Sequence, residues 1–195
     1  MNALLVIAHP NKTSFSHAMA GVAIQTLTDA GYKCAVHDLY AEAFNPIQPV
    51  SESANTVSTD ALVEEHCAEL ALADLVLVFH PNWWSQPPAI LKGWIDRVLR
   101  LNTAYGYPED IGYEGVAVGL LKAKRALVFN TSNTPLEREA SVFGDPLETL
   151  WRTCIFGLCG VKSVNRRMFG PIASSTEEQR ASWLAEVRSV VQHAA

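Results

Sequence analysis

The chain has 195 residues, about 1.3 times a typical domain length, so we expect one domain with insertions. Apolar residues make up 49% of the chain and charged residues 18%, which provides a large core and excludes extended disorder. The 20 acidic and 15 basic residues give a formal net charge of −5, which argues against binding to nucleic acids or to anionic membranes.

The chain shows no sign of a targeting or membrane-spanning segment. Residues 1–8 are apolar but lack a basic beginning, and no apolar run reaches the roughly 18 residues that span a bilayer. We therefore expect a soluble, cytoplasmic protein with no membrane insertion. The four cysteines form no zinc-type CxxC pair and are too sparse for a disulfide framework, so reduced thiols are expected.

The first third of the chain predicts a strand, a helix and a strand. The short apolar run at 4–8 is typical of a strand buried on both faces of a parallel sheet. An amphipathic helix follows over 15–27 and ends near Gly31, and a second strand covers 32–39. Residues 41–60 are rich in Asn, Pro, Ser and Thr, which predicts a long, largely irregular excursion.

The middle of the chain repeats this pattern. A helix is expected from a cap at Thr59 or Asp60 to Leu72, followed by a buried strand over 74–79. Pro87 and Pro88 can open the next helix, which continues to Leu99, because proline is tolerated in a first helical turn. A second irregular excursion then covers 102–124.

The last third predicts a strand over 125–129, a helix over 146–157, a strand over 161–169 and a helix over 176–192. Alternating strands and helices favour a doubly wound, five-stranded parallel sheet between two helical layers, formed by a single domain of residues 1–195. In such α/β folds, ligands bind beyond the carboxyl ends of the strands.

Three polar loops follow predicted strands, so we expect them at one edge of the sheet. The first, 9–16, feeds a helix whose free N–H groups suit a phosphate, although an ordinary capped helix start would also explain it. No GxxxxGK[ST] or GxGxxG motif occurs there, which argues against a P-loop or a dinucleotide-binding loop. The second, 81–85, carries Trp83 and Trp84. The third, 130–134, supplies hydroxyl and amide groups.

Two adjacent tryptophans on an exposed loop indicate a flat ring or a partner surface that covers them, although one of them could pack under the following helix. If the first loop binds a phosphate, the second a flat ring and the third the polar edge of that ring, the ligand is a mononucleotide with a planar head group. A flavin fits this description best.

Four sequence segments carry a family resemblance: Ala8-His9-Pro10 with Thr13-Ser14-Phe15-Ser16, Asp38-Leu39-Tyr40, Phe44-Asn45-Pro46-Ile47, and Pro88-Ala89-Ile90-Leu91-Lys92-Gly93-Trp94. With these segments the chain resembles the flavodoxin-like NAD(P)H:quinone oxidoreductase family. That family includes mammalian quinone reductase and bacterial relatives that act as potassium-efflux ancillary proteins or as drug-activity modulators.

The resemblance implies an enzyme that reduces quinones or similar acceptors with NAD(P)H by ping-pong hydride transfer through bound flavin. The flavin would be FAD or FMN, with a preference for FAD because the 38–47 stretch is similar to the mammalian type. The family also implies a homodimer with the flavin near its interface.

The resemblance further implies which residues would contact the ligands. No side chain is assigned as catalytic, since the flavin carries the chemistry. The cofactor-binding residues would be His9, Thr13, Ser14, Phe15, Ser16, Pro81, Asn82, Trp83, Trp84, Ser85, Asn130, Thr131, Ser132 and Asn133. The substrate pocket would be formed by Trp84, Tyr105, Tyr107 and Phe143. The chain departs from mammalian members where Glu137 and Phe143 replace a Tyr and a His, and where the 130–133 loop lacks glycines.

Other functions remain as alternatives. A flavin-binding regulatory subunit of a membrane transporter with weak reductase activity is the second hypothesis. A one-electron flavodoxin carrier is the third, disfavoured by the insertion at 102–124. Ser14 or Ser16 with His9 could suggest a hydrolase, but no GxSxG motif occurs.

The remaining charged and imidazole groups are interpreted as structural. No metal site is predicted, because His17, His37, His66 and His80 lack metal-ligand spacing. Arg166 and Arg167 are expected on a solvated strand face. Asp96, Arg97 and Arg100 are expected on the polar side of a helix.

Overall fold

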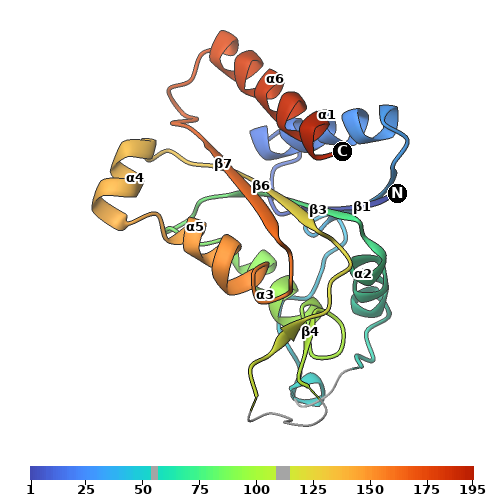
Figure 1. The fold of residues 1–195 in the computed structure, drawn as a ribbon. Helices are drawn as coiled ribbons and strands as arrows, with labels where there is room; N and C mark the ends of the chain where they lie inside the picture. Colours follow the sequence, from blue (N-terminus) through green and yellow to red (C-terminus); the bar gives the residue numbers. More distant parts are fainter. Residues whose placement is uncertain (54–56, 109–114) are drawn as a thin grey trace.

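The computed structural model describes residues 1–53, 57–108 and 115–195, and parts of both predicted excursions, 54–56 and 109–114, lie outside them (Figure 1). The main sheet contains β1 (Asn2–Ile7), β2 (Lys33–Asp38), β3 (Leu75–Pro81), β6 (Arg125–Thr131) and β7 (Ser163–Phe169). Its helices are α1 (Phe15–Asp29), α2 (Ala61–Leu72), α3 (Ala89–Val98), α4 (Leu136–Phe143), α5 (Pro146–Thr149) and α6 (Glu177–Ala194).

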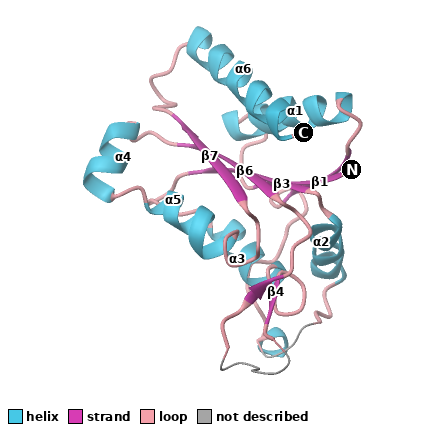
Figure 2. Cartoon of the chain, viewed as in Figure 1, coloured by secondary structure: helices cyan, strands magenta, loops and turns pink. Residues whose placement is uncertain are grey.

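All five strands of the main sheet are parallel, in the order β2-β1-β3-β6-β7, which confirms the predicted fold class. Helices α1 and α6 cover one face of the sheet, and α2, α3 and α5 cover the other (Figure 2). The central strands β1, β3 and β6 are apolar on both sides because their side chains alternate between these two helical layers. Leu4 and Val6 enter one core cluster, whereas Ala3 and Leu5 enter the other.

The predicted helix caps are found where the sequence placed them. Asp60 rather than Thr59 caps α2, and its side chain accepts the N–H of Leu62. Thr176 caps α6 in a reciprocal arrangement with Gln179, in which each side chain bonds the backbone N–H of the other residue. Of the described helices, none is long and apolar enough to cross a membrane.

Several elements differ from the prediction. Helix α4 was not predicted, and the expected helix over 146–157 divides into α5 and a π-helical segment, Leu150–Ile155. Both excursions contain short regular elements. A 3-10 turn, Val50–Glu52, lies in the first, and the second contains an antiparallel pair, β4 (Tyr105–Gly106) and β5 (Val118–Gly119).

Arg97 of α3 binds residues of the first excursion. Its side chain was expected to face solvent but is buried. Only 3% of its surface is exposed. Its guanidinium donates to both carboxylate oxygens of Glu52, at 2.9 and 2.7 Å, and to Asp60 and the carbonyl of Asn45. A second contact joins the same elements, because a Cβ at Gly93 would stand 2.2 Å from the carbonyl oxygen of Pro46. The excursion therefore packs directly on the backbone of α3.

A cluster of two buried histidines and two half-buried glutamates links the other end of this excursion to α2. His37 lies between Glu42 and Glu69, with one ring nitrogen 2.9 Å from the first carboxylate and the other 2.5 Å from the second. Its ring stacks on His66, whose Nε2 lies 3.4 Å from Glu42. The sequence did not indicate that these side chains meet.

The hydrogen bonds of this cluster favour a proton network over a metal site. The indole of Trp94 can only donate, and it donates to Nδ1 of His66 at 2.9 Å. The ring hydrogen of His66 must then lie on Nε2, which faces Glu42, so no lone pair is left there for a metal. Burial opposes protonation of His37, but its hydrogen bonds and charge interactions with Glu42 and Glu69 outweigh burial and raise its pKa.

Replacing Arg97 with alanine should lower the free energy of unfolding by about 3–5 kcal/mol, because Glu52 would keep a buried charge without its cation. Urea denaturation followed by circular dichroism measures this change. Lys92→Ala is the matched control, since it removes an exposed ion pair with Asp96 from the same helix and should cost less than about 1 kcal/mol. Equal losses in the two variants would contradict the anchoring role of Arg97.

The cluster also predicts a pH dependence of stability. Burial alone would raise the pKa of Glu42, but hydrogen bonds and charges from His37 and His66 lower it from 4.5 to about 2. Because the pKa of Glu42 is lower in the folded state, its carboxylate stabilises the fold by about 3 kcal/mol at pH values above 4.5. This contribution is lost as the pH falls towards 2. Stability contributed by the raised pKa of His37 is present below 6.5 and is lost as the pH rises through the folded-state pKa.

Glu42→Gln should therefore be less stable than the parent protein at pH 6, and the difference should shrink steadily as the pH is lowered below 4.5. Urea titrations at several pH values measure it. The control Glu65→Gln alters an exposed glutamate of the same region and should show no such convergence. A Glu42→Gln deficit that is constant with pH would contradict the proton network.

Candidate functional site

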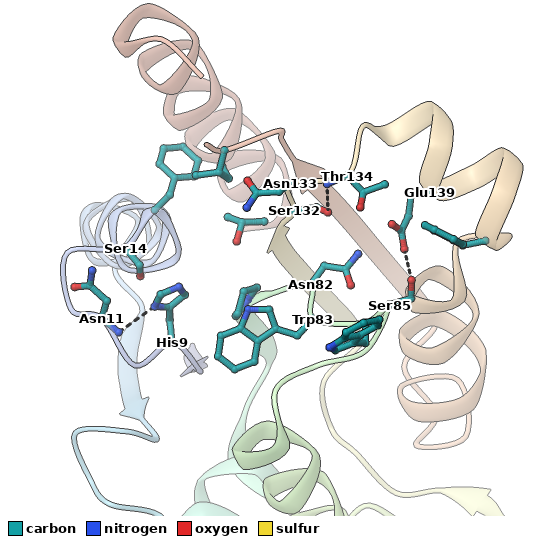
Figure 3. Close-up of a pocket in the computed structure, with 16 residues that line it drawn as sticks. His9, Asn11, Ser14, Asn82, Trp83, Ser85, Ser132, Asn133, Thr134 and Glu139 are labelled. Carbon is teal, nitrogen blue, oxygen red and sulfur yellow. Dashed lines mark hydrogen bonds between the residues drawn. The ribbon is translucent and has the colours of Figure 1, made fainter. Parts of the chain in front are cut away.

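A cavity of about 690 Å³ opens at the carboxyl ends of β1, β3 and β6 (Figure 3). It lies where the sheet order reverses, because α1 leaves β1 over one face of the sheet and α3 leaves β3 over the other, so the loops after the two strands diverge. The lining residues are His9, Asn11, Ser14, Phe15, Pro81, Asn82, Trp83, Trp84, Ser85, Thr131, Ser132, Asn133, Thr134, Glu139, Phe143 and Ile172.

The loop after β1 forms one end of the cavity and is held by its own side chains. Nδ1 of His9 accepts the N–H of Asn11 at 3.0 Å, which places the ring hydrogen of the neutral imidazole on Nε2. The Asn11 side chain in turn accepts from both the N–H and the hydroxyl of Thr13, at 2.9 and 2.8 Å. Burial, followed by the charge of His17, lowers the pKa of His9 below 6.5.

Helix α1 begins at this end of the cavity. Ser14 is its N-cap and accepts the N–H of His17 at 3.3 Å. The hydroxyl of Ser14 also lies 2.9 Å from Nδ1 of His17, and Nε2 of that ring lies 3.0 Å from the Asp38 carboxylate at the end of β2. These bonds fix the helix start, whose first N–H groups have the geometry that suits an anion.

The loop after β3 makes a tight turn that presents two side chains to the cavity. Trp83 and Gln86 exchange N–H···O bonds, both 3.0 Å long, across Trp84 and Ser85. Both central residues have a φ of +56°, which is the type I′ geometry that Asn and Gly usually supply. Backbone strain of this kind is concentrated at functional sites. The Trp84 side chain is 98% exposed and Trp83 is 43% exposed, so neither is buried under α3.

Asn82 supplies an unsatisfied polar atom. Its side-chain oxygen is buried and has no hydrogen-bond partner among the described residues, although the residue lines the cavity. An unpaired buried acceptor is costly, and a ligand N–H would satisfy it. The ring of Trp83 lies beside His9, with centroids 6.4 Å apart, so the first two loops meet.

The loop after β6 closes the third side and is packed against the chain that follows β7. Ser132 accepts the N–H of Thr134 through its hydroxyl and the N–H of Ile172 through its carbonyl. The side chain of Asn133 accepts the N–H of Ala173 at 2.9 Å. A Cβ at Gly170 would stand 2.3 Å from the Ser132 carbonyl oxygen, so the loop depends on a glycine in the neighbouring strand end.

The cavity has few charged groups. Among its lining residues, all from the described part of the chain, there is no lysine or arginine, and Glu139 is the one carboxylate. Glu139 is 1% exposed and accepts a hydrogen bond of 2.8 Å from the Ser85 hydroxyl. Figure 3 shows this pair at the side of the cavity opposite His9, Asn11 and Ser14. An anion would therefore be held mainly by neutral N–H and hydroxyl donors.

The structure brings most of the expected contact residues to the cavity. Eleven of the fourteen expected cofactor-binding residues line it, as does Phe143 of the expected substrate pocket; the eleven are His9, Ser14, Phe15, Pro81, Asn82, Trp83, Trp84, Ser85, Thr131, Ser132 and Asn133. Five expected residues do not line it: Thr13, Ser16, Asn130, Tyr105 and Tyr107.

These five exceptions have physical explanations. Thr13 bonds Asn11 and is exposed, whereas Ser16 is fully buried in the first turn of α1. Asn130 precedes Thr131 on β6, so the alternation of the strand turns it to the other face, where it accepts from Arg166 at 2.8 Å. Tyr105 packs against the core in β4, and its ring lies 6.3 Å from that of Tyr107.

Arg166 corrects a further expectation. It is 9% exposed rather than solvated, and it bonds Asp145, Glu148 and Asn130 beside α5. These hydrogen bonds link Asn130, near the end of β6, through Arg166 to the two carboxylates beside α5.

Sequence reasoning missed four lining residues: Asn11, Thr134, Glu139 and Ile172. Asn11 and Thr134 lie within the loops 9–16 and 130–134, which were expected at this edge of the sheet, so their place in the cavity lining could have been predicted. Glu139 gave no such signal, because a charged residue in a short polar stretch indicates an exposed surface. Glu137, which stands where mammalian members of the resembling family carry a tyrosine, is exposed and does not line the cavity.

The chain is similar to a known protein family and to known proteins over nearly its whole length. The Flavodoxin_2 family model, described as a flavodoxin-like fold, matches residues 1–191. An uncharacterized NAD(P)H oxidoreductase of Haemophilus influenzae is 34% identical over 190 residues, covering 94% of this chain and 91% of the relative. A ribosyldihydronicotinamide dehydrogenase (quinone) of Rattus norvegicus is 33% identical over 215 residues, covering 96% and 90%.

Solved structures agree in fold. An NAD(P)H:quinone oxidoreductase from Methanothermobacter marburgensis superposes with a TM-score of 0.81 at 25% identity, covering 100% of this chain and 99% of the other. An FMN-dependent NADH-azoreductase from Bacillus anthracis, solved in complex with FMN, has a TM-score of 0.75 and covers 98% of both chains. At 18% identity the azoreductase shows the shared fold alone.

Proposed function

The chain belongs to the Flavodoxin_2 family, and from this premise we propose that it is a flavin-dependent oxidoreductase that uses NAD(P)H to reduce quinones or similar acceptors. The observation that carries the proposal is the cavity at the carboxyl ends of β1, β3 and β6, where three loops supply an anion-binding helix start, exposed tryptophans and an unpaired acceptor. The names of the H. influenzae and rat relatives support the oxidoreductase class.

The lining residues fit a flavin. The start of α1 with Ser14 would hold the phosphate through N–H and hydroxyl groups, since no cationic side chain lines the cavity. Trp83 and Trp84 would lie along the ring system. The buried oxygen of Asn82 would accept an N–H from the ring, which satisfies an atom that otherwise has no partner in the described part of the protein.

The preference for FAD over FMN finds no support. An adenine would need residues of 41–60 together with the start of α1, and none of the lining residues comes from the described parts of 41–60. The cavity thus supports a mononucleotide, and we propose FMN as the cofactor.

Bound flavin would supply the two-electron chemistry, accepting hydride from reduced nicotinamide and passing it to the acceptor. The protein contributes position and exclusion of water. Reduced nicotinamide and the acceptor would both have to bind against the exposed aromatic side chains of this cavity, so they would bind there in turn. We therefore propose ping-pong turnover. Trp84 and Phe143 would contact both molecules.

The protein should take up FMN and turn yellow, and reduced nicotinamide alone should bleach it under anaerobic conditions, because the first half-reaction needs no acceptor. A later addition of a quinone should restore the colour. Mass measurement of the flavin released on denaturation identifies the cofactor, and steady-state rates against both substrates should give parallel double-reciprocal lines.

Three outcomes would contradict parts of this proposal. A protein that takes up neither FMN nor FAD is not a flavoenzyme. Release of FAD would overturn only the choice of FMN and would leave the rest of the proposal in place. Converging double-reciprocal lines would mean that donor and acceptor bind together, against the shared cavity.

We also propose a homodimer that completes the cavity. Trp84, Leu136, Val142 and Phe143 are between 45% and 98% exposed at or beside the cavity, more apolar surface than a monomer usually leaves in one place. Tyr105 and Tyr107 do not line the cavity of their own chain, so in this proposal they wall the cavity of the partner.

Sedimentation equilibrium should give twice the 21.3 kDa mass of one chain at micromolar concentration. Trp84→Glu should shift the equilibrium towards the monomer, because a charge would replace buried aromatic surface. Lys122→Glu, an exposed charge change elsewhere, is the control. A parent protein that sediments as a monomer would contradict the dimer.

A further inference from the structure

Glu139 is a buried carboxyl group in a helix that otherwise faces solvent. It is 1% exposed, and it is the one buried residue of α4. Helix α4 runs beyond the carboxyl ends of β6 and β7, and Glu139 points from it to the turn after β3 (Figure 3). The side chain therefore stands in the wall of the cavity rather than on the surface.

The partner of Glu139 is neutral. Its Oε1 accepts from the Ser85 hydroxyl at 2.8 Å, and no lysine or arginine lines the cavity. Burial of a carboxylate without a cation is costly, and a glutamine could accept the same hydrogen bond at no such cost. What the carboxyl group adds is the ability to hold and release a proton.

Ser85 is fixed between this carboxyl group and the cavity. It lines the cavity, and its φ of +56° holds it in the strained turn closed by Trp83 and Gln86. A serine hydroxyl both donates and accepts. When Glu139 is protonated, its O–H can donate to Ser85 Oγ while the Ser85 hydrogen is directed at a bound molecule. Two residues 54 positions apart thus form a short proton path.

We propose that Glu139, through Ser85 Oγ, supplies the proton that a quinone-like acceptor takes up during its reduction. This inference rests on the proposed function. Reduction of a quinone consumes one hydride equivalent and one proton: two electrons and one hydrogen originate in the reduced nicotinamide, and the second O–H bond needs a proton. Ser85 gives its hydrogen to the acceptor oxygen and receives that of Glu139, which is left as a carboxylate and is reprotonated from solvent.

The test compares acceptors that differ in their need for a proton. The protein with FMN is first reduced anaerobically by reduced nicotinamide, and its reoxidation is then followed with 1,4-benzoquinone or with ferricyanide. Ferricyanide takes single electrons and no proton. The variants are Glu139→Gln and Ser85→Ala. Glu137→Gln is the matched control, because it makes the same change on the same helix at an exposed residue.

Glu139→Gln and Ser85→Ala should each slow reoxidation by benzoquinone about 100-fold, the usual size of a general-acid contribution, and Glu139→Gln should change the ferricyanide rate less than about twofold. The FMN affinity of Glu139→Gln, measured by fluorescence quenching on the apoprotein, should match that of the parent. Glu137→Gln should resemble the parent throughout.

The outcomes separate this inference from the proposed function. Equal slowing with both acceptors, or weakened FMN binding that accounts for the loss, would make Glu139 a structural residue and overturn its role as acid. Unchanged benzoquinone rates in Glu139→Gln and Ser85→Ala would overturn it as well. A parent protein that binds no flavin would instead overturn the proposed function, and this inference with it.

Discussion

The pairing of β1 with β3 at the centre of the parallel sheet determines where every candidate functional residue lies. The two strands run side by side in register, from Ala3 opposite Leu75 to Ile7 opposite Phe79, and end at the same edge. Because α1 and α3 then cover opposite faces, the polypeptide leaves a crevice between the two strand ends. The loop after β6 joins it by the same parallel pairing. Backbone hydrogen bonds thus position side chains that come from segments of the chain far apart in sequence.

The turn after β3 shows how this scaffold supports unfavourable local geometry. Trp84 and Ser85 both adopt a left-handed conformation that costs of order 1–3 kcal/mol for a residue with a side chain. Two N–H···O bonds between Trp83 and Gln86 and the buried Ser85 to Glu139 bond hold it in place. Glycine would fit the backbone better, but it would remove the ring and the hydroxyl that the turn presents to the cavity.

Sequence patterns predicted the features that depend on apolar periodicity and strand ends. The strands at 4–8 and 74–79 were evident because runs of branched apolar residues suit a sheet covered on both faces, and the loops that follow them had to share an edge. Arg97 and Arg166 were misjudged, and Glu139 was overlooked, for the opposite reason: a charged side chain is expected to be exposed, and its burial depends on a partner far away in sequence. Helix α4 was missed because it is short and its one buried residue is a glutamate.

The close contact of Gly93 with Pro46 and the Arg97 to Glu52 ion pair also constrain the order in which the chain can fold. Both join residues of the first excursion to residues of α3 that lie more than 40 positions later in the chain. During synthesis, Pro46 and Glu52 therefore lack these partners until α3 has left the ribosome. Contacts of such sequence separation form late, since the intervening loop must close first. This part of the excursion thus gains its contacts with α3 late, although it is among the first segments to be made.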